Sequence, residues 1–173
     1  MKMGVLTGTK IISTGEKLEF SPEDLKKIEE FKSRYPDHTS AVMPTLWLAQ
    51  GRFGFLSDEA LGAVAAALDL PKPEVIAVAT FYSMYNREPV GKYIIQVCCT
   101  LSCSLMGADA LIEHLKRKLG IDFGETTPDG KFTLRKVECL ASCGTAPMMQ
   151  INEGNYHENL TLEKVDQILD SLE

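Results

Sequence analysis

Four cysteines in two short pairs are the residues of this 173-residue chain best suited to chemistry. Four residues separate Cys98 from Cys103, and three separate Cys139 from Cys143. No other part of the sequence holds a comparable density of soft ligands. Thiolates at such short separations, each pair in a loop, can converge on one soft metal centre from two sides.

The spacing within each pair argues against the commoner cysteine sites. A structural zinc site more often has a gap of about two residues within each pair, and a thioredoxin-type dithiol needs Cys-x-x-Cys. Plant-type ferredoxins place three ligands in one run. The pattern therefore favours a four-thiolate site built from two loops, and specifically a [2Fe–2S] cluster. A zinc-stapled structural or docking module remains the alternative from a different functional class.

A fifth cysteine, Cys99, leaves one ligand ambiguous. Cys99 and Cys103 are separated by three residues, which repeats the spacing of Cys139 and Cys143. Spacing alone therefore does not decide whether Cys98 or Cys99 is the ligand, and one of the two is spare.

The composition limits the partners. The chain carries 24 acidic and 18 basic residues, for a net charge of -6, which disfavours nucleic acid or an anionic membrane surface. No apolar run approaches the roughly 20 residues that span a bilayer, so we expect no membrane insertion. The N-terminus lacks the pattern of a signal peptide, and the cysteines suit a reducing compartment. These features predict a soluble protein of the cytoplasm or the mitochondrial matrix.

Two regions must position the cysteines, and the first, residues 1–90, is predicted to be helical after an extended stretch of about 18 residues. Helices are expected near residues 21–35, 41–50, 57–68 and 71–82. Ser21 and Ser57 are N-cap candidates followed by acidic residues, as helix starts require. Four short helices with short links predict a small bundle.

The second region, residues 91–173, alternates strands and helices. We expect strands at 92–97, 132–138, 146–151 and 156–158, and helices at 107–119 and after Thr161, an N-cap candidate. The order predicts an α/β sandwich of thioredoxin-like kind in which both cysteine loops leave strand ends, with Pro147 as a candidate cis proline. The fold class is thus α+β or α/β, with a helical bundle before the cysteine-bearing domain.

The predicted loops suit an anionic cluster. Backbone amides just beyond each cysteine lie outside the strand ladder and can point at sulfur. Gly144 is expected to supply backbone freedom beside Cys143. The side chains expected to exclude water from the site are Leu101, Leu105, Leu140 and Met148.

Beyond these local patterns, the chain resembles a known family, the small [2Fe–2S] subunit of NADH:quinone oxidoreductase (respiratory complex I), which is the bacterial E subunit. The resemblance covers nearly everything from Phe20 onward. The matching segments are 34–36, 49–50, 74–75, 78–86 (VATFYSMYN), 89–93, 96–98, 126–130, 137–140 and 146–152 (APMMQIN).

The resemblance implies a ligand set and a role. Carried over, the four ligands are Cys98, Cys103, Cys139 and Cys143, with Cys99 spare. It implies a thioredoxin-like C-terminal domain whose cluster takes one electron from reduced FMN. NAD and FMN would reach the chain only through a tightly bound partner, the FMN/NADH-binding subunit, beside other subunits of the peripheral arm. The complex would lie on the cytoplasmic side of the inner membrane, or the matrix side in mitochondria.

Some alternatives stay open. A similar subunit serves some NAD-linked hydrogenases and formate dehydrogenases. No residue of this chain is expected to act as a catalytic acid or base, so it would be an enzyme only as part of its complex. The aromatic residues Phe81, Tyr82 and Tyr85 suit either the bundle core or an anchor for the FMN subunit.

Overall fold

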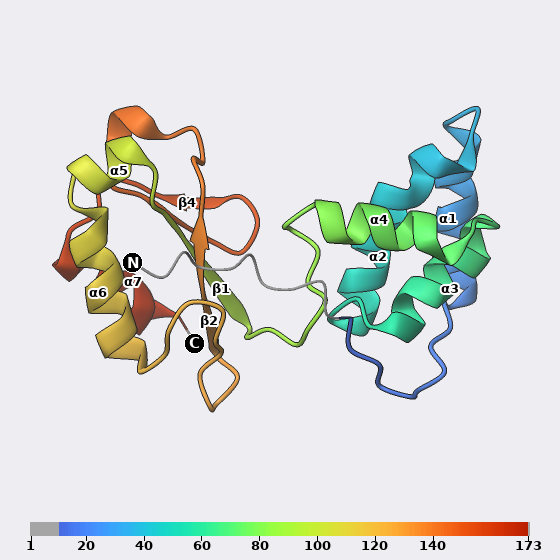
Figure 1. Ribbon diagram of the computed structural model, residues 1–173, viewed down its shortest axis with the longest axis horizontal. Coiled ribbons are helices and arrows are strands. Elements are labelled where there is room, and N and C mark those ends of the chain that lie inside the picture. Colours follow the sequence, from blue (N-terminus) through green and yellow to red (C-terminus); the bar gives the residue numbers. More distant parts are fainter. Residues whose placement is uncertain (1–10, 173) are drawn as a thin grey trace. The chain divides into compact units, whose positions relative to one another are not determined.

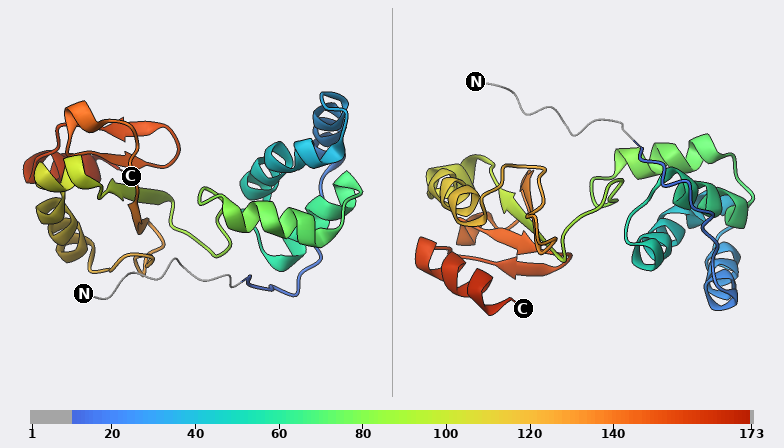
Figure 2. Two further views of the ribbon diagram at one scale, coloured as in Figure 1. Left: turned by 45° about the horizontal axis from the view of Figure 1, so that its top comes forward. Right: turned by 90° about the horizontal axis from the view of Figure 1, so that it is seen from below.

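The computed structural model describes residues 11–172, which divide into two compact units, Met1–Pro89 and Val90–Glu173 (Figure 1). The expected extended stretch falls outside the described residues as far as residue 10, and residues 11–20 contain neither helix nor strand. The first unit is helical and the second contains the only sheet of the described residues (Figures 1 and 2).

All four helices expected in the first unit are present. They are α1 (Pro22–Ser33), α2 (Val42–Phe53), α3 (Asp58–Leu68) and α4 (Lys72–Phe81), with an additional 3-10 turn, η1 (His38–Ala41). The hydroxyl of Ser21 accepts from the Asp24 amide and the Asp24 carboxylate accepts from the Ser21 amide, a reciprocal cap that fixes the start of α1. Ser57 caps α3 through the Ala60 amide.

One aromatic residue of the bundle is core and another is surface. Tyr85 is 4% exposed and its hydroxyl donates to the carbonyl of Met43 at 3.0 Å, whereas Phe81 is 78% exposed. Burial raises the pKa of Tyr85 to about 12. Tyr85 is therefore a core residue, and only the exposed Phe81 and Tyr82 remain as surface aromatics of this segment.

A carboxylate of α3 holds the stretch that precedes α1. Glu59 accepts hydrogen bonds from the hydroxyl of Ser13 and from the amides of Thr14 and Gly15, the last two at 3.0 and 2.9 Å. These bonds lower the pKa of Glu59 strongly, that from Ser13 most. The contact fixes an irregular segment on the bundle.

The second unit follows the predicted order with two additions, the short helix α5 (Leu101–Leu105) and the 3-10 turn η2 (Cys143–Thr145). Its elements are β1 (Tyr93–Cys98), α5, α6 (Ala108–Leu119), β2 (Phe132–Val137), η2, β3 (Met149–Ile151), β4 (Asn155–His157) and α7 (Leu162–Ser171). The cysteine loop expected between the strand at 92–97 and the helix at 107–119 is in part helical, because α5 lies within it. The predicted cis peptide at Ala146–Pro147 is confirmed, and β3 begins only after it, at Met149.

The sheet has the strand order β2-β1-β3-β4. Strands β1 and β2 are parallel and place Cys98 opposite Val137, while β3 and β4 are antiparallel to their neighbours. The apolar side chains of α6 and α7 pack against one face of this sheet. That core comprises Ile95, Val97, Leu111, Ile112, Leu115, Leu134, Met149, Ile151, Val165 and Leu169.

Gly91 allows β1 and β2 to begin close together. Its amide donates to the hydroxyl of Thr133 at 2.6 Å, and a Cβ at this position would lie 2.8 Å from the carbonyl carbon of Phe132. Because the neighbouring atoms are backbone, no side-chain rotation could make room. A glycine is therefore required where the chain enters the sheet.

Candidate metal centre

The parallel pairing of β1 and β2 brings both cysteine pairs to one edge of the sheet. Cys98 is the last residue of β1, and Cys139 follows the last residue of β2, Val137, by two positions. Parallel neighbours end on the same side, so the loops that leave them are adjacent. In Figure 1 the segment after β2, in orange, lies beside α5 at this end of the unit.

The second pair is exposed and its two sulfurs are close. The Sγ atoms of Cys139 and Cys143 are 3.4 Å apart, and both residues lie at the surface. Ala141 between them adopts a left-handed conformation with φ 62°. The predicted role of Gly144 is not borne out by its backbone, because a Cβ there meets nothing within 4 Å and its φ is not positive. Ala141 makes the turn instead.

The first pair is buried and interacts with the second. Cys98 and Cys103 are each 1% exposed and belong to the same buried cluster. Both also interact electrostatically with the thiol of Cys143. In the described part of the chain, no three His, Cys, Asp or Glu side chains converge as a single-ion site requires. The four thiols lie instead as two neighbouring pairs.

Backbone amides point at the sulfurs, as the sequence predicts. The Ala141 amide donates to the Cys139 sulfur at 3.3 Å. The amides of Thr100 and Leu140 act to lower the pKa of Cys98, and the Met148 amide acts in the same direction on the pKa of Cys103. Such donors favour the thiolate form that a soft metal needs.

The two buried thiols differ in acidity. Burial and the neighbouring Cys98 thiol raise the pKa of Cys103 to about 11. Burial acts in the same direction on Cys98, but hydrogen bonds led by the Thr100 hydroxyl outweigh it and lower the pKa of Cys98. At Cys143, the hydrogen bond with Cys139 raises the pKa of the thiol. Binding of a metal cation by these thiols would therefore release protons from Cys103 and Cys143.

Cys99 points away from this group. Its Sγ lies 3.1 Å from the carbonyl oxygen of Val137, and its side chain packs against the core beneath α6 and α7. Successive strand residues face opposite sides of a sheet, so Cys98 and Cys99 cannot both face the site. Spacing alone could not provide this distinction.

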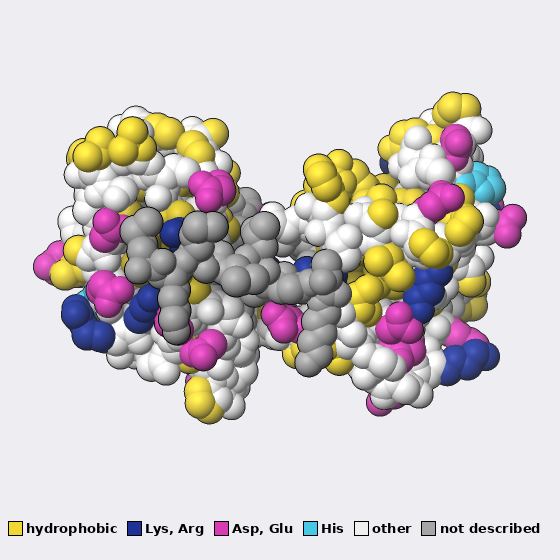
Figure 3. All heavy atoms as spheres, viewed as in Figure 1, with side chains coloured by type: hydrophobic (Ala, Val, Ile, Leu, Met, Phe, Trp, Pro, Cys, Tyr) yellow, Lys and Arg dark blue, Asp and Glu magenta, His cyan; other side chains and the backbone are white. Residues whose placement is uncertain are grey.

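The surface around the pairs is apolar. Leu101, Leu105 and Met106 on and after α5 are 74%, 76% and 62% exposed. Figure 3 shows hydrophobic side chains gathered over this end of the unit. Of the four side chains expected to exclude water, Leu101 and Leu105 are exposed in this chain, Leu140 is partly buried and Met148 is fully buried beside the first pair.

The donor set fits a [2Fe–2S] cluster. Each iron of such a cluster takes two protein thiolates, and the cysteines here are arranged as two pairs. The surrounding amides offset the negative charge that four thiolates would bring.

Comparison with known proteins gives the family. A family model described as thioredoxin-like [2Fe-2S] ferredoxin matches residues 28–173. The chain belongs to this family. The family and the four-stranded sheet with its helices confirm the predicted mixed, thioredoxin-like fold.

Relatives of the chain carry the name of one respiratory component. An NADH-quinone oxidoreductase E subunit of Rhizobium meliloti is 45% identical over 146 residues, covering 84% of this chain and 86% of that protein. The E subunit of NADH-quinone oxidoreductase from Rickettsia felis is 45% identical over 154 residues, covering 87% and 92%. The predicted resemblance is thereby confirmed, and the relatives are subunits of an oxidoreductase complex.

A solved structure has the same fold. The crystal structure of an NAD+-reducing [NiFe]-hydrogenase in the air-oxidized state aligns with a TM-score of 0.64 at 24% identity, covering 73% of this chain but only 22% of that chain. Its H2-reduced state aligns with a TM-score of 0.62 at 25% identity and the same coverage. Among residues 11–172, no helix is both long and apolar enough to cross a bilayer.

Proposed function

We propose that this chain is the electron-transfer subunit of an NADH:quinone oxidoreductase and that Cys98, Cys103, Cys139 and Cys143 hold one [2Fe–2S] cluster. The observation that carries the proposal is the meeting of two thiol pairs at the carboxyl ends of two adjacent parallel strands. The relatives that are E subunits of this oxidoreductase support the assignment to the complex.

In the reaction, this chain holds the cluster and shields it from solvent. When bound, a [2Fe–2S] cluster supplies one-electron redox chemistry, here toward the reduced FMN of a partner subunit. Cys98 and Cys103 provide the buried side of the site, and Cys139 and Cys143 the exposed side. Backbone amides such as that of Ala141 stabilise thiolate charge. No acid, base or nucleophile of this chain is needed.

The surface beside the site supports a partner subunit. The exposed Leu101, Leu105 and Met106 lie next to the buried cysteine pair, where a partner that exchanges electrons has to come close. We therefore place the FMN/NADH-binding subunit on this face, with other peripheral-arm subunits elsewhere. NAD and FMN belong to that partner. Residues 1–90 and 91–173 would act as two domains within a complex on the cytoplasmic side of the inner membrane, or on the matrix side in mitochondria.

Anaerobic reconstitution of the full chain tests the cluster directly. We expect a red-brown protein with about two irons and two sulfides per chain, whose reduced form gives the signal of one unpaired electron in electron paramagnetic resonance (EPR). A colourless protein with one zinc per chain would instead establish the structural or docking module and overturn the proposal.

A different enzyme complex is the alternative assembly for a chain that holds this cluster. Similarity to the NAD+-reducing hydrogenase at 25% identity supports an equivalent subunit of an NAD-linked hydrogenase, and a formate dehydrogenase is the other assembly proposed from the sequence. Affinity purification of the tagged chain from its source separates the two. Co-purified NADH oxidation coupled to quinone reduction supports the respiratory complex, and NAD-linked hydrogen or formate oxidation supports the second assembly.

A further inference from the structure

The loop that carries the second cysteine pair is fixed from outside by the residues that follow β4. The Glu158 Oε1 atom accepts hydrogen bonds from the hydroxyls of Ser142 and Thr145, the latter at 2.6 Å. The amide of Asn159 donates to the carbonyl of Thr145 at 2.7 Å. Two consecutive residues thus hold both ends of one short turn.

The internal hydrogen bonds of this turn all join Ser142 and Thr145. Between Ser142 and Thr145 there are a hydroxyl–hydroxyl contact of 2.8 Å and two bonds to the Ser142 carbonyl, each at 3.2 Å. Regular structure in the loop is confined to η2, and Cys139 and Cys143 are exposed. Because Ser142 directly precedes Cys143, an anchor on its hydroxyl acts close to the proposed ligand.

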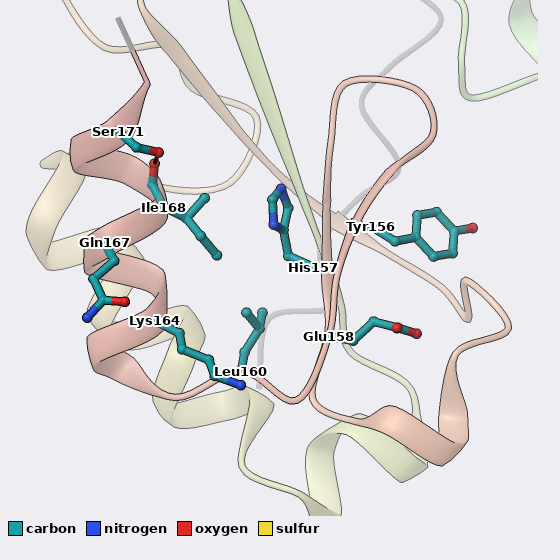
Figure 4. A pocket seen from close by; sticks show the side chains of 8 residues that line it. All are labelled: Tyr156, His157, Glu158, Leu160, Lys164, Gln167, Ile168 and Ser171. Atoms are coloured by element: carbon teal, nitrogen blue, oxygen red, sulfur yellow. Dashed lines mark hydrogen bonds between the residues drawn. The ribbon is translucent and has the colours of Figure 1, made fainter.

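Glu158 reaches the turn because of the strand that precedes it. Figure 4 shows His157 facing α7, while Tyr156 and Glu158 point away from that helix. The start of α7 is fixed separately, by the Thr161 hydroxyl that accepts from the Lys164 amide at 3.2 Å. The carboxylate therefore serves the cysteine loop and not the helix.

The carboxylate of Glu158 forms no ion pair with the residues that the structure describes. Over residues 11–172, no lysine, arginine or histidine nitrogen lies within 4.0 Å of this carboxylate, although other acids of the unit, such as Asp166, have such partners. A fixed negative charge beside an electron acceptor disfavours its reduction. The same side chain therefore combines a mechanical and an electrostatic effect on the site.

We propose that Glu158 is a positioning residue that holds the Cys139–Cys143 loop and whose negative charge lowers the reduction potential of the [2Fe–2S] cluster, an inference that rests on the proposed function. Two variants separate its two effects. Glu158→Gln removes the charge and keeps an oxygen that accepts hydrogen bonds, whereas Glu158→Ala removes both. Glu153→Gln is the matched control, because it removes one charge from the β3–β4 hairpin at a side chain whose contact is Gln150.

The experiment combines a redox titration followed by EPR on the cluster-loaded full chain with hydrogen–deuterium exchange on the metal-free chain. In Glu158→Gln we expect the ratio of reduced to oxidised cluster at fixed ambient potential to rise about threefold. This threefold change corresponds to a rise of about 30 mV in the reduction potential, because a tenfold change in the ratio equals 59 mV for a one-electron couple. Exchange of the loop amides stays near wild type in this variant. In Glu158→Ala we expect those amides to exchange about tenfold faster.

Each outcome tests one of the two roles proposed for Glu158. A potential in Glu158→Gln equal to that of Glu153→Gln overturns the electrostatic role, and unchanged loop exchange in Glu158→Ala overturns the positioning role. Absence of any cluster signal in the wild-type chain overturns the proposed function together with the electrostatic role. Exchange on the metal-free chain would then still decide whether Glu158 positions the loop.

Discussion

Serine substitutions at Cys98 and Cys99 offer the sharpest test of the proposed ligand set, because the two residues are neighbours in sequence and face opposite sides of the sheet. Each change replaces one sulfur by oxygen. Cys98 packs in one cluster with Cys103 and contacts the Thr100 hydroxyl, whereas Cys99 contacts the carbonyl of Val137 and the core beneath α6 and α7. The chemical perturbation is the same and the expected results differ.

The magnitudes follow from these contacts. Loss of residues that merely support a metal ligand typically costs 10–100-fold in metal affinity, so loss of Cys98 itself should cost at least about tenfold in cluster content. Cys99→Ser keeps a donor for the Val137 carbonyl, so the free energy of unfolding should change by no more than about 1 kcal/mol. That corresponds to about 4–8 °C in Tm for a unit of this size.

Iron and sulfide analysis, EPR of the reduced protein and thermal unfolding of the metal-free chain measure these quantities. We expect Cys98→Ser to lose the cluster while its metal-free form still folds, and Cys99→Ser to retain wild-type iron. If Cys99→Ser loses the cluster and Cys98→Ser keeps it, the assignment from strand alternation is refuted. Thermal unfolding of the metal-free forms separates loss of a ligand from loss of the fold.

Three further sets of changes probe the scaffold. Gly91→Ala should destabilise the second unit by about 1–3 kcal/mol, lowering its Tm by about 5–20 °C, because the new Cβ meets backbone. Gly62→Ala, where a Cβ is 3.9 Å from the nearest atoms, should stabilise α3 by about 0.5–1 kcal/mol. Burial lowers the pKa of His157 below its ordinary 6.5, so the unfolded chain binds the proton more tightly. The contribution of neutral His157 to the free energy of unfolding is therefore complete above about pH 6.5 and is lost as the pH falls below that value. His157→Gln should reduce this loss of stability at low pH. Glu59→Gln should speed amide exchange in residues 13–15 without affecting the second unit.

Each of these has a result that contradicts it. The two glycine variants should change stability in opposite directions, so a neutral Gly91→Ala would show that β1 and β2 begin further apart. An unchanged dependence of Tm on pH between about 6.5 and 5.5 in His157→Gln would remove the assigned effect of burial. If the amides of residues 13–15 exchange in Glu59→Gln at the wild-type rate, the hydrogen bonds of Glu59 do not hold this segment.

Local chemistry made much of the fold predictable. Ser21, Ser57 and Thr161 each precede a helix and each accepts the capping hydrogen bond expected of it. Alternating residues in β2 and the apolar run in β1 predict strands that are present within a residue or two. Pairs of cysteines at the ends of these strands are enough to indicate a site.

Other features depend on contacts that a local pattern does not contain. Nothing in the strand segments says that β1 lies between β2 and β3, which is what makes the cysteine loops adjacent. Helix α5 has five residues, two of them serine, and is too short for an apolar stripe to mark it. The contact of Glu158 with Ser142 joins residues 16 positions apart through an exposed acid that no motif distinguishes.

The parallel pairing of β1 with β2 also sets an order for maturation. A growing chain that has reached α6 offers one pair of thiols and nothing opposite it. Only after β2 has been synthesised and has docked against β1 do Cys139 and Cys143 arrive beside Cys98 and Cys103. If the four cysteines hold the cluster as proposed, a chain whose β2 has not yet docked offers only two of the four ligands, and complete insertion of the cluster follows folding of this unit.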